Sequence, residues 1–315
     1  MRENNSGFKI DESQRQSWLS IAAVWAGGMI CVPCLMIGGV LAGGGLSLGQ
    51  IVLSILIGYG LICVYMICIG MQACDTGLPV SVMASGALGE KGARYIISAL
   101  LAIACVGWFG IQSATCGSAF ASMVANMLGT EATPIFISIS SIVWGVIMLL
   151  TACVGFKGLK WLNYIAVPLL VIVCLYGLIA GIVTNDGGSA IGTLLAAFGL
   201  LNAFQSFLSL MSALIPPLAG VLIASYWIVG KGKRENFSPR PGFSAVGVIS
   251  FAIGAVFACI TGGTFASFPG LVEALPFLNW PFFVGPVNGI VVSLVLYVGL
   301  AKLTSAKRMP AKQAA

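Results

Sequence analysis

Long apolar stretches, separated by short polar breaks, occupy almost the whole chain. An α-helix needs about 20 apolar residues to cross a bilayer core about 30 Å thick, and most of the stretches reach that length. The pattern therefore predicts an all-α polytopic membrane protein with one membrane domain. The apolar stretches cover residues 18–44, 49–73, 95–126, 133–156, 161–183, 189–205, 206–229, 242–264 and 276–303.

The positions of lysine and arginine predict the orientation in the membrane. The 15 basic residues fall in five short clusters, and each gap between clusters has room for two crossings with a turn between them. Because cytoplasmic loops carry the excess of Lys and Arg, we expect all five clusters and both termini on the cytoplasmic side. The clusters are Arg2/Lys9/Arg15, Lys91/Arg94, Lys157/Lys160, Lys231/Lys233/Arg234/Arg240 and Lys302/Lys307/Arg308/Lys312.

The third gap, between Lys160 and Lys231, holds one apolar stretch too many for this arrangement. Three crossings in that gap would put the last two basic clusters outside, against the positive-inside rule. The conflict disappears if residues 189–205, a short stretch with polar Asn202 and Gln205 near its end, lie at the interface or re-enter without crossing. We therefore expect eight transmembrane helices, with nine as the alternative.

The composition agrees with a membrane protein and argues against other classes. Hydrophobic residues make up 59% of the chain and charged residues 8%, whereas soluble domains carry about 25% charged residues. The net charge of +6 does not indicate nucleic-acid binding, because the basic residues are dispersed at loop ends, and anionic lipid headgroups are the expected partners. We expect cytoplasmic tails at 1–17 and 305–315, no cleavable signal peptide, and one transmembrane domain at 18–304.

Ten cysteines and no histidine restrict the chemistry. The lack of histidine excludes Ser-His-Asp and Cys-His catalytic sets and His-ligated metals. Most cysteines lie inside apolar runs, where Cys packs as a small residue. Cys31 and Cys34 form a C-x-x-C pair within the first helix; packing is the expected role, with membrane thiol chemistry as the alternative. We predict no enzyme activity, no metal and no cofactor.

Prolines interrupt two of the apolar stretches. Pro33 lies between Gly27-Gly28 and Gly38-Gly39 and predicts a kink or an unwound turn in the first helix. Pro216-Pro217 predicts a second break. Transporters use broken helices to coordinate cations and substrate, and an ordinary packing kink is the alternative at both places.

Trp108 and Gln112 form the polar feature of the third stretch. They lie four residues apart, and hence on one face of a helix, near the middle of the span. An indole can stack on a flat heterocycle, and a Gln amide one turn away can donate and accept hydrogen bonds in the plane of that ring. The spacing alone favours substrate contact and helix packing equally.

Five segments of the chain form a recognisable set: 38–47 (GGVLAGGGLS), 75–78 (DTGL), 106–112 (VGWFGIQ), 160–168 (ending IAVP) and 215–226 (beginning IPP). Together these segments, which are spread over most of the chain, resemble the nucleobase:cation symporter-1 family, the cytosine permease branch in particular. In that family, a tryptophan and a glutamine matching Trp108 and Gln112 stack on the base and hydrogen-bond it.

The resemblance implies an incomplete five-plus-five inverted-repeat bundle, like that of amino-acid and hydantoin transporters. Residues 18–183 look like family helices one to five and residues 189–303 like helices nine to twelve, so helices six to eight have no counterpart. The family's unwound first helix matches Cys31 to Leu35, which implies substrate contacts at Pro33 and Cys34 and backbone cation contacts at Cys31 and Val32.

The resemblance also implies a function. We expect a multi-pass permease of the inner, cytoplasmic membrane that takes up a neutral nucleobase, cytosine or a related purine or pyrimidine, coupled to Na⁺ or H⁺. The alternative is a non-transporting, internally deleted remnant or a membrane protein that binds a base without cycling. Two copies could complete one pathway by self-association, although the sequence shows no complementary surface.

Overall fold

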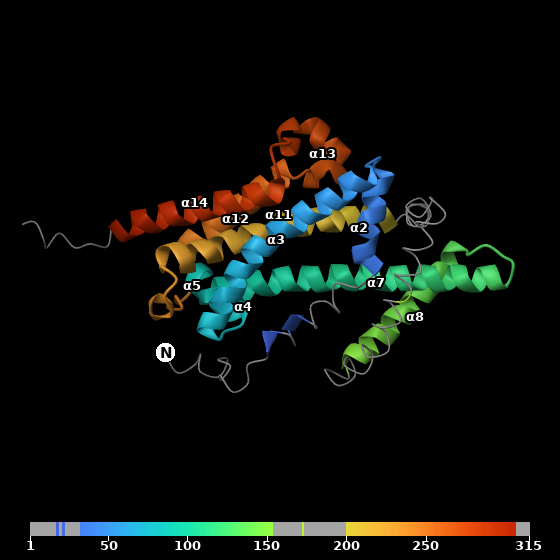
Figure 1. Cartoon of the computed structure of the whole chain (residues 1–315), viewed down its shortest axis with the longest axis horizontal. Helices are drawn as coiled ribbons and strands as arrows, with labels where there is room; N and C mark the ends of the chain where they lie inside the picture. The colour runs from blue at the N-terminus through green and yellow to red at the C-terminus, as the bar shows by residue number, and fades with distance from the viewer. Residues whose placement is uncertain (1–16, 19–20, 23–31, 154–171, 173–199, 307–315) are drawn as a thin grey trace, which may run out of the picture. The chain divides into compact units, whose positions relative to one another are not determined.

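The computed structural model describes residues 17–18, 21–22, 32–153, 172 and 200–306 (Figure 1). These residues form helices joined by turns and loops, without β-strands in the described ranges, which confirms the all-α prediction. Five of the helices are long and apolar enough to cross a membrane. Most of the stretches 161–183 and 189–205 lies outside the described residues, as does most of 18–31. From Val32 the first stretch is described as the α-helix α2 (Val32–Gly43), so the unwound turn expected around Cys31 to Leu35 is wrong for residues 32–35.

The helix bounds follow the apolar stretches closely over the described chain. Four helices correspond to the second, third, fourth and eighth predicted stretches: α3 (Leu48–Thr76), α7 (Ser98–Met127), α8 (Pro134–Cys153) and the shorter α12 (Ala245–Thr261). A short π-helix, η3 (Ala93–Ile97), precedes α7, and its backbone is wound more widely than that of the α-helix that follows. The main helices are α2 (Val32–Gly43), α3 (Leu48–Thr76), α7 (Ser98–Met127), α8 (Pro134–Cys153), α11 (Leu200–Ile223), α12 (Ala245–Thr261) and α14 (Gly285–Ala306).

The chain divides into two compact units. Among the described residues, unit 1 comprises 58–104 and 206–306, and unit 2 comprises 32–57, 105–153 and 200–205 together with the isolated residues 17–18, 21–22 and 172. Helices α3, α7 and α11 each begin in one unit and continue in the other.

In unit 2, α7 and α8 form a helical hairpin with a close interface. Gly117 lies directly against Ser141, where a Cβ atom would overlap the α8 backbone. One turn further along α8, Gly145 faces Ser113, and a T-shaped contact between Phe120 and Trp144 closes the interface with ring centroids 5.8 Å apart. Small residues thus let the two backbones approach, as is usual between membrane helices.

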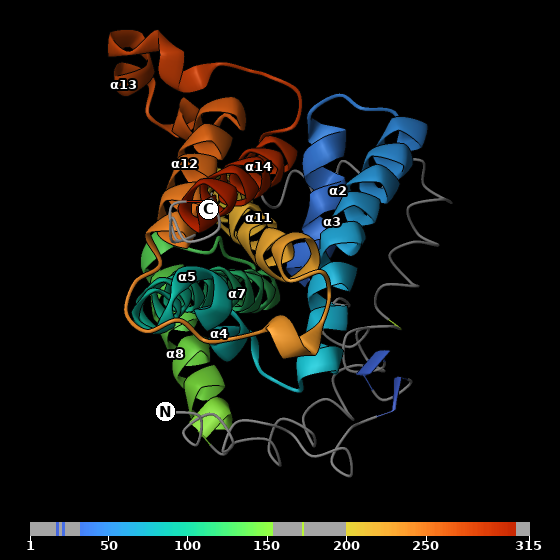
Figure 2. The ribbon, with the colours of Figure 1, turned by 90° about the vertical axis from the view of Figure 1, so that its left-hand side faces the viewer.

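In unit 1, α11, α12 and α14 run side by side (Figures 1 and 2). Small residues again make the contacts: a Cβ atom on Gly289 of α14 would lie 2.7 Å from Pro217 Cγ and 2.8 Å from Ala258 Cβ. A Cβ atom on Gly254 of α12 would lie 2.7 Å from Ser293 Cβ. Close packing between helices therefore surrounds Pro217.

The structure corrects two predictions about the segment that contains this double proline. Residues 200–205, predicted to belong to a separate stretch, continue without a break into α11, and a π-helical segment η4 (Ala224–Val229) extends it. The helix also continues through Pro216 and Pro217. Pro217 is fully buried and lies against glycines of α12 and α14, which agrees with the packing alternative and not with an unwound turn.

A third correction concerns the last apolar stretch. Residues 276–284 are not part of the helix: a 3₁₀ turn, η7 (Pro276–Asn279), precedes an irregular segment, and α14 begins only at Gly285. Pro281 disfavours helical backbone at the residue before it, and Phe283 has a left-handed φ of 50°. Apolar composition alone could not show this interruption.

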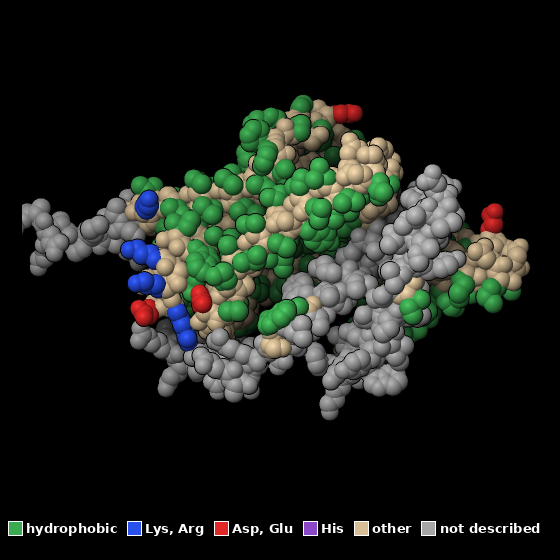
Figure 3. All heavy atoms as spheres, in the orientation of Figure 1, with side chains coloured by type: hydrophobic (Ala, Val, Ile, Leu, Met, Phe, Trp, Pro, Cys, Tyr) green, Lys and Arg blue, Asp and Glu red, His purple; other side chains and the backbone are tan. Residues whose placement is uncertain are grey.

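The short segments at one end of unit 1 join two of the basic clusters. The loop around α5 (Ser85–Leu88) and α6 (Glu90–Gly92) pairs with the loop that precedes α12. Glu90 N donates to Arg240 O at 2.8 Å and Ser244 N donates to Leu88 O at 2.7 Å. Figure 3 shows the Lys and Arg side chains of the described chain gathered at this end of unit 1, with apolar side chains along its flank.

Candidate functional site

Trp108 lies in the part of α7 that belongs to unit 2, and its side chain is half-buried. Its indole makes a T-shaped contact with Phe204, the rings being 6.3 Å apart at an angle of 67°. Phe204 comes from the first turns of α11 and is only 1% exposed. The buried phenyl ring therefore positions the indole, while part of the indole surface remains accessible.

Gln112 lies one turn along α7 from Trp108, on the same face, and is also half-buried. Thr115 follows on that face and donates a hydrogen bond from its hydroxyl to Ile111 O at 2.7 Å, which leaves the Thr115 oxygen able to accept another. The face therefore offers an aromatic plane, an amide and a hydroxyl in sequence. It carries no charge, because residues 95–130 contain no Asp, Glu, Lys or Arg.

The predicted contacts in the first helix lie mostly outside the described residues. Cys31 is not described, and for Val32, Pro33 and Cys34 the structure gives the backbone of α2 without a description of the side chains. The structure thus brings together Trp108 and Gln112, as predicted. The roles assigned to residues 31–34 stay predictions.

Sequence reasoning missed Phe204. The sequence analysis assigned no aromatic partner to Trp108, yet Phe204 packs against it in this chain. Residues 189–205 were assigned to an interfacial or re-entrant segment, which hid the contact. The available signal was an aromatic side chain between Asn202 and Gln205 in an otherwise apolar helix.

A second polar network, also missed, lies at the basic end of unit 1. Tyr226 is 3% exposed and donates a hydrogen bond from its hydroxyl to Asp75 Oδ2 at 3.0 Å. The neighbouring Trp227 donates from its indole nitrogen to Cys68 O at 3.0 Å. These two hydrogen bonds connect η4 to the C-terminal part of α3. Asp75 and Tyr226 occur in the segments that resemble the symporter family, where the sequence assigned them no role.

The described cysteines show no sign of redox or metal chemistry. All seven of them are free thiols, and no cluster of three or more potential metal ligands occurs within the described ranges. Cys31 and Cys34 lie outside this test. Packing remains the simplest role for the cysteines of α3, α7, α8 and α12.

Chemically, the face of α7 suits a flat, uncharged ligand. Stacking on the indole is worth about 1–3 kcal/mol for a nucleobase. The Gln112 amide can donate and accept in the plane of the same ring. An ionic ligand would find no counter-charge on α7, and burying an unpaired charge in a membrane span is costly.

Comparison with known proteins gives a consistent result. A family profile described as "Permease for cytosine/purines, uracil, thiamine, allantoin" matches residues 9–197, well over half of the chain. The cytosine permease of Escherichia coli K12 is 32% identical over 188 residues, which is 59% of this chain and 42% of that protein. Cytosine permeases of E. coli strains O6:H1 and O157:H7 match to the same extent. The alignment thus covers less than half the length of these relatives.

Proposed function

Because the chain belongs to the family of permeases for cytosine/purines, uracil, thiamine and allantoin, we propose that it carries a neutral nucleobase across a membrane. The proposed substrate is cytosine or a related purine or pyrimidine. Movement against a concentration gradient would be coupled to Na⁺ or H⁺, as in secondary active transport.

The observation that carries this proposal is the uncharged face of α7 with Trp108 and Gln112. Trp108 contacts the buried Phe204 and is itself half-buried, so that part of its surface stays accessible. A preformed aromatic plane of this kind lowers the entropic cost of binding a flat ring. The Gln112 amide, one turn away, fixes the orientation of the bound base, because a base rotated in its own plane would lose the hydrogen bonds to this amide.

We further propose a multi-pass protein of the inner membrane with eight crossings and both termini in the cytoplasm. The loops that carry the second and fourth basic clusters are hydrogen-bonded to each other, Arg240 N donating to Ser85 O at 3.2 Å and Lys91 N to Gly242 O at 2.9 Å. An even number of crossings between these loops is needed for that contact. Nine crossings would place the two loops on opposite sides of the bilayer.

A non-transporting membrane protein is the second candidate. The match to the E. coli cytosine permease covers 42% of that protein, so a chain that binds a base without cycling is consistent with the same α7 face. Such a protein would bind cytosine when purified and would not accumulate it in cells. If the chain is a permease, self-association of two copies could complete one transport pathway and so allow cytosine to accumulate.

Radiolabelled cytosine uptake by cells that lack their own cytosine permease tests the proposal. We expect saturable accumulation upon expression of the chain and its loss in Trp108→Ala, with both proteins present in the membrane at equal amounts. Competition by unlabelled uracil, adenine and allantoin would define the substrate. Absence of uptake by a correctly inserted protein would reject transport, and absence of binding as well would reject the base site.

A further inference from the structure

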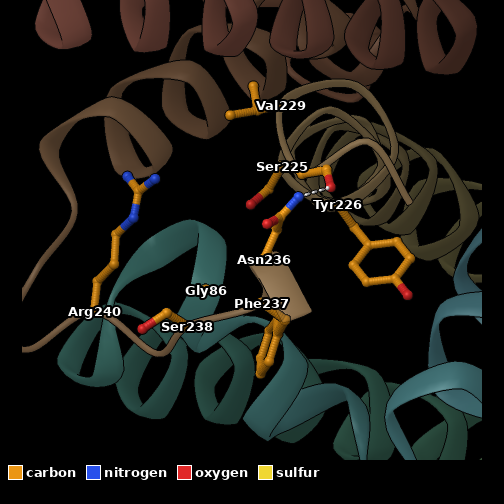
Figure 4. A pocket seen from close by; sticks show the side chains of 9 residues that line it. Gly86, Ser225, Tyr226, Val229, Asn236, Phe237, Ser238 and Arg240 are labelled. Carbon is orange, nitrogen blue, oxygen red and sulfur yellow. Dashed lines mark hydrogen bonds between the residues drawn. The ribbon is translucent and has the colours of Figure 1, made fainter. Parts of the chain in front are cut away.

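A polar cavity of about 270 Å³ lies at the basic end of unit 1, between η4, the loop before α12 and α5 (Figure 4). Its lining includes the guanidinium of Arg240, the hydroxyls of Ser225 and Ser238, and the amide of Asn236. No carboxylate belongs to the lining that the structure describes. The cavity therefore offers several hydrogen-bond donors and one positive charge without a built-in counter-ion.

The main chain around the cavity is held in place before any ligand binds. Arg240 N donates to Ser85 O at 3.2 Å, and Arg240 O accepts from Glu90 N at 2.8 Å. Phe237 packs against Gly86 so closely that a Cβ atom there would lie 2.8 Å from the ring. These contacts involve only the backbone of Arg240, which is exposed and belongs to the cavity lining.

The hydroxyl and amide groups are also oriented. The hydroxyl of the fully buried Tyr297 donates to Ser225 Oγ at 3.1 Å, so the Ser225 proton can point to a ligand. One N–H of Asn236 donates to Gly230 O at 2.9 Å (Figure 4), and the second N–H remains for another acceptor. A guanidinium with hydroxyl and amide donors around it is a set that binds phosphate oxygens.

The position of the cavity indicates where such a phosphate would come from. Ile228 and Val229, at the end of the apolar α11–η4 segment, are exposed, and Val229 belongs to the cavity lining. At the same end of unit 1, Tyr95 of η3 stacks on Phe243 of the loop before α12, with ring centroids 6.3 Å apart. Aromatic residues of this kind mark the level of the lipid headgroups. Basic pockets between membrane helices at that level bind anionic headgroups.

We propose that this cavity is a binding site for a phosphate group, supplied by the headgroup of an anionic phospholipid. Arg240 pairs with the phosphate, while Ser225, Ser238 and Asn236 donate hydrogen bonds to its oxygens. The bound headgroup would bridge η4 and the loop before α12 at the membrane surface. The site shares no residue with the face of α7 and does not depend on which base the protein carries.

Native mass spectrometry of the full chain in neutral detergent tests this site, with added phosphatidylglycerol, phosphatidylcholine or inorganic phosphate. We expect one tightly held phosphatidylglycerol, no comparable retention of phosphatidylcholine, and an at least tenfold loss of affinity in Arg240→Gln. Lys233→Gln is the matched control, because it removes the same charge from the same loop outside the cavity lining. It should change the affinity less than twofold.

The remaining outcomes also decide the question. Displacement of the lipid by millimolar inorganic phosphate would support a phosphate-binding site but would overturn the assignment of its ligand to a phospholipid headgroup. An equal loss in Arg240→Gln and Lys233→Gln would show general attraction to a basic surface, and this result would overturn the proposal, as would equal retention of the two lipids. Elution as a single symmetric peak in size-exclusion chromatography checks that both variants are folded.

Discussion

Replacing Trp108 by alanine should weaken base binding by an amount that follows from stacking. The indole is half-buried and lies on the same α7 face as Gln112, so Trp108→Ala removes the stacking plane and keeps the amide. The loss of about 1–3 kcal/mol of stacking corresponds to a roughly 5- to 150-fold higher dissociation constant for cytosine. Trp108→Phe keeps a smaller ring and should fall between the wild type and Trp108→Ala.

The same substitution also removes the edge contact with Phe204, worth about 0.5–1.5 kcal/mol. This second loss affects the stability of unit 2, and a separate variant is needed to tell the two effects apart. Phe204→Leu removes the contact while leaving the indole in place. We therefore expect Phe204→Leu to lower the melting temperature and to raise the dissociation constant much less than Trp108→Ala does.

Equilibrium binding of radiolabelled cytosine to the purified variants is the appropriate assay, because it is independent of transport. Gln112→Leu, which keeps the side-chain volume and removes the amide, should cost about tenfold in affinity, since one or two hydrogen bonds are worth about 0.5–1.5 kcal/mol each. The reasoning is refuted if Trp108→Ala binds cytosine as the wild type does. It is equally refuted if Phe204→Leu loses as much affinity as Trp108→Ala, because the indole would then act only as a packing residue.

Three further predictions concern packing and orientation. Gly289→Ala should lower the apparent melting temperature by roughly 2–10 °C, because its Cβ would overlap Pro217 and such overpacking costs about 1–3 kcal/mol. Gly299→Ala, on the same helix with open space around it, should leave the temperature unchanged or raise it, and equal shifts would contradict the packing account. Tyr226→Phe should cost about 1 kcal/mol by removing the bond to Asp75, a loss that chemical denaturation can measure. A single cysteine at Lys233, in a chain without other reactive thiols, should react only with membrane-permeable maleimide in intact cells; labelling from outside would contradict eight crossings.

Hydrophobic length predicted the long helices well because lipid imposes it directly. For α3, α7 and α8 the observed bounds differ from the predicted stretches by no more than three residues at either end. A span needs about 20 apolar residues, and its ends are marked by polar or proline-containing turns. Length and polarity are properties of a local segment, so no knowledge of the tertiary structure was required.

The errors arose where backbone conformation or distant contacts decide the structure. The segment 276–284 is as apolar as a helix, yet two prolines and a left-handed Phe283 keep it irregular. Conversely, Pro216 and Pro217 looked like a break, yet the helix continues through them, with Gly254 and Gly289 of neighbouring helices packed closely against Pro217. The glycines come from helices later in the chain, which local sequence reasoning could not connect to the prolines.

In the candidate site, too, local features could be predicted from the sequence and contacts between distant segments could not. Trp108 and Gln112 could be placed on one face from their spacing alone. The contact of Trp108 with Phe204 and the cavity beside Arg240 depend on segments far apart in the sequence. Only the folded chain brings them together.

Transport by the purified chain in proteoliposomes is the measurement that tests the central claim most directly. Vesicles that contain this protein alone receive external radiolabelled cytosine with an inward Na⁺ or H⁺ gradient. The account predicts accumulation above the external concentration with one of these gradients, its collapse when an ionophore dissipates the gradient, and no accumulation with Trp108→Ala. Cytosine that binds to the protein but never exceeds the level in protein-free vesicles under either gradient would contradict it.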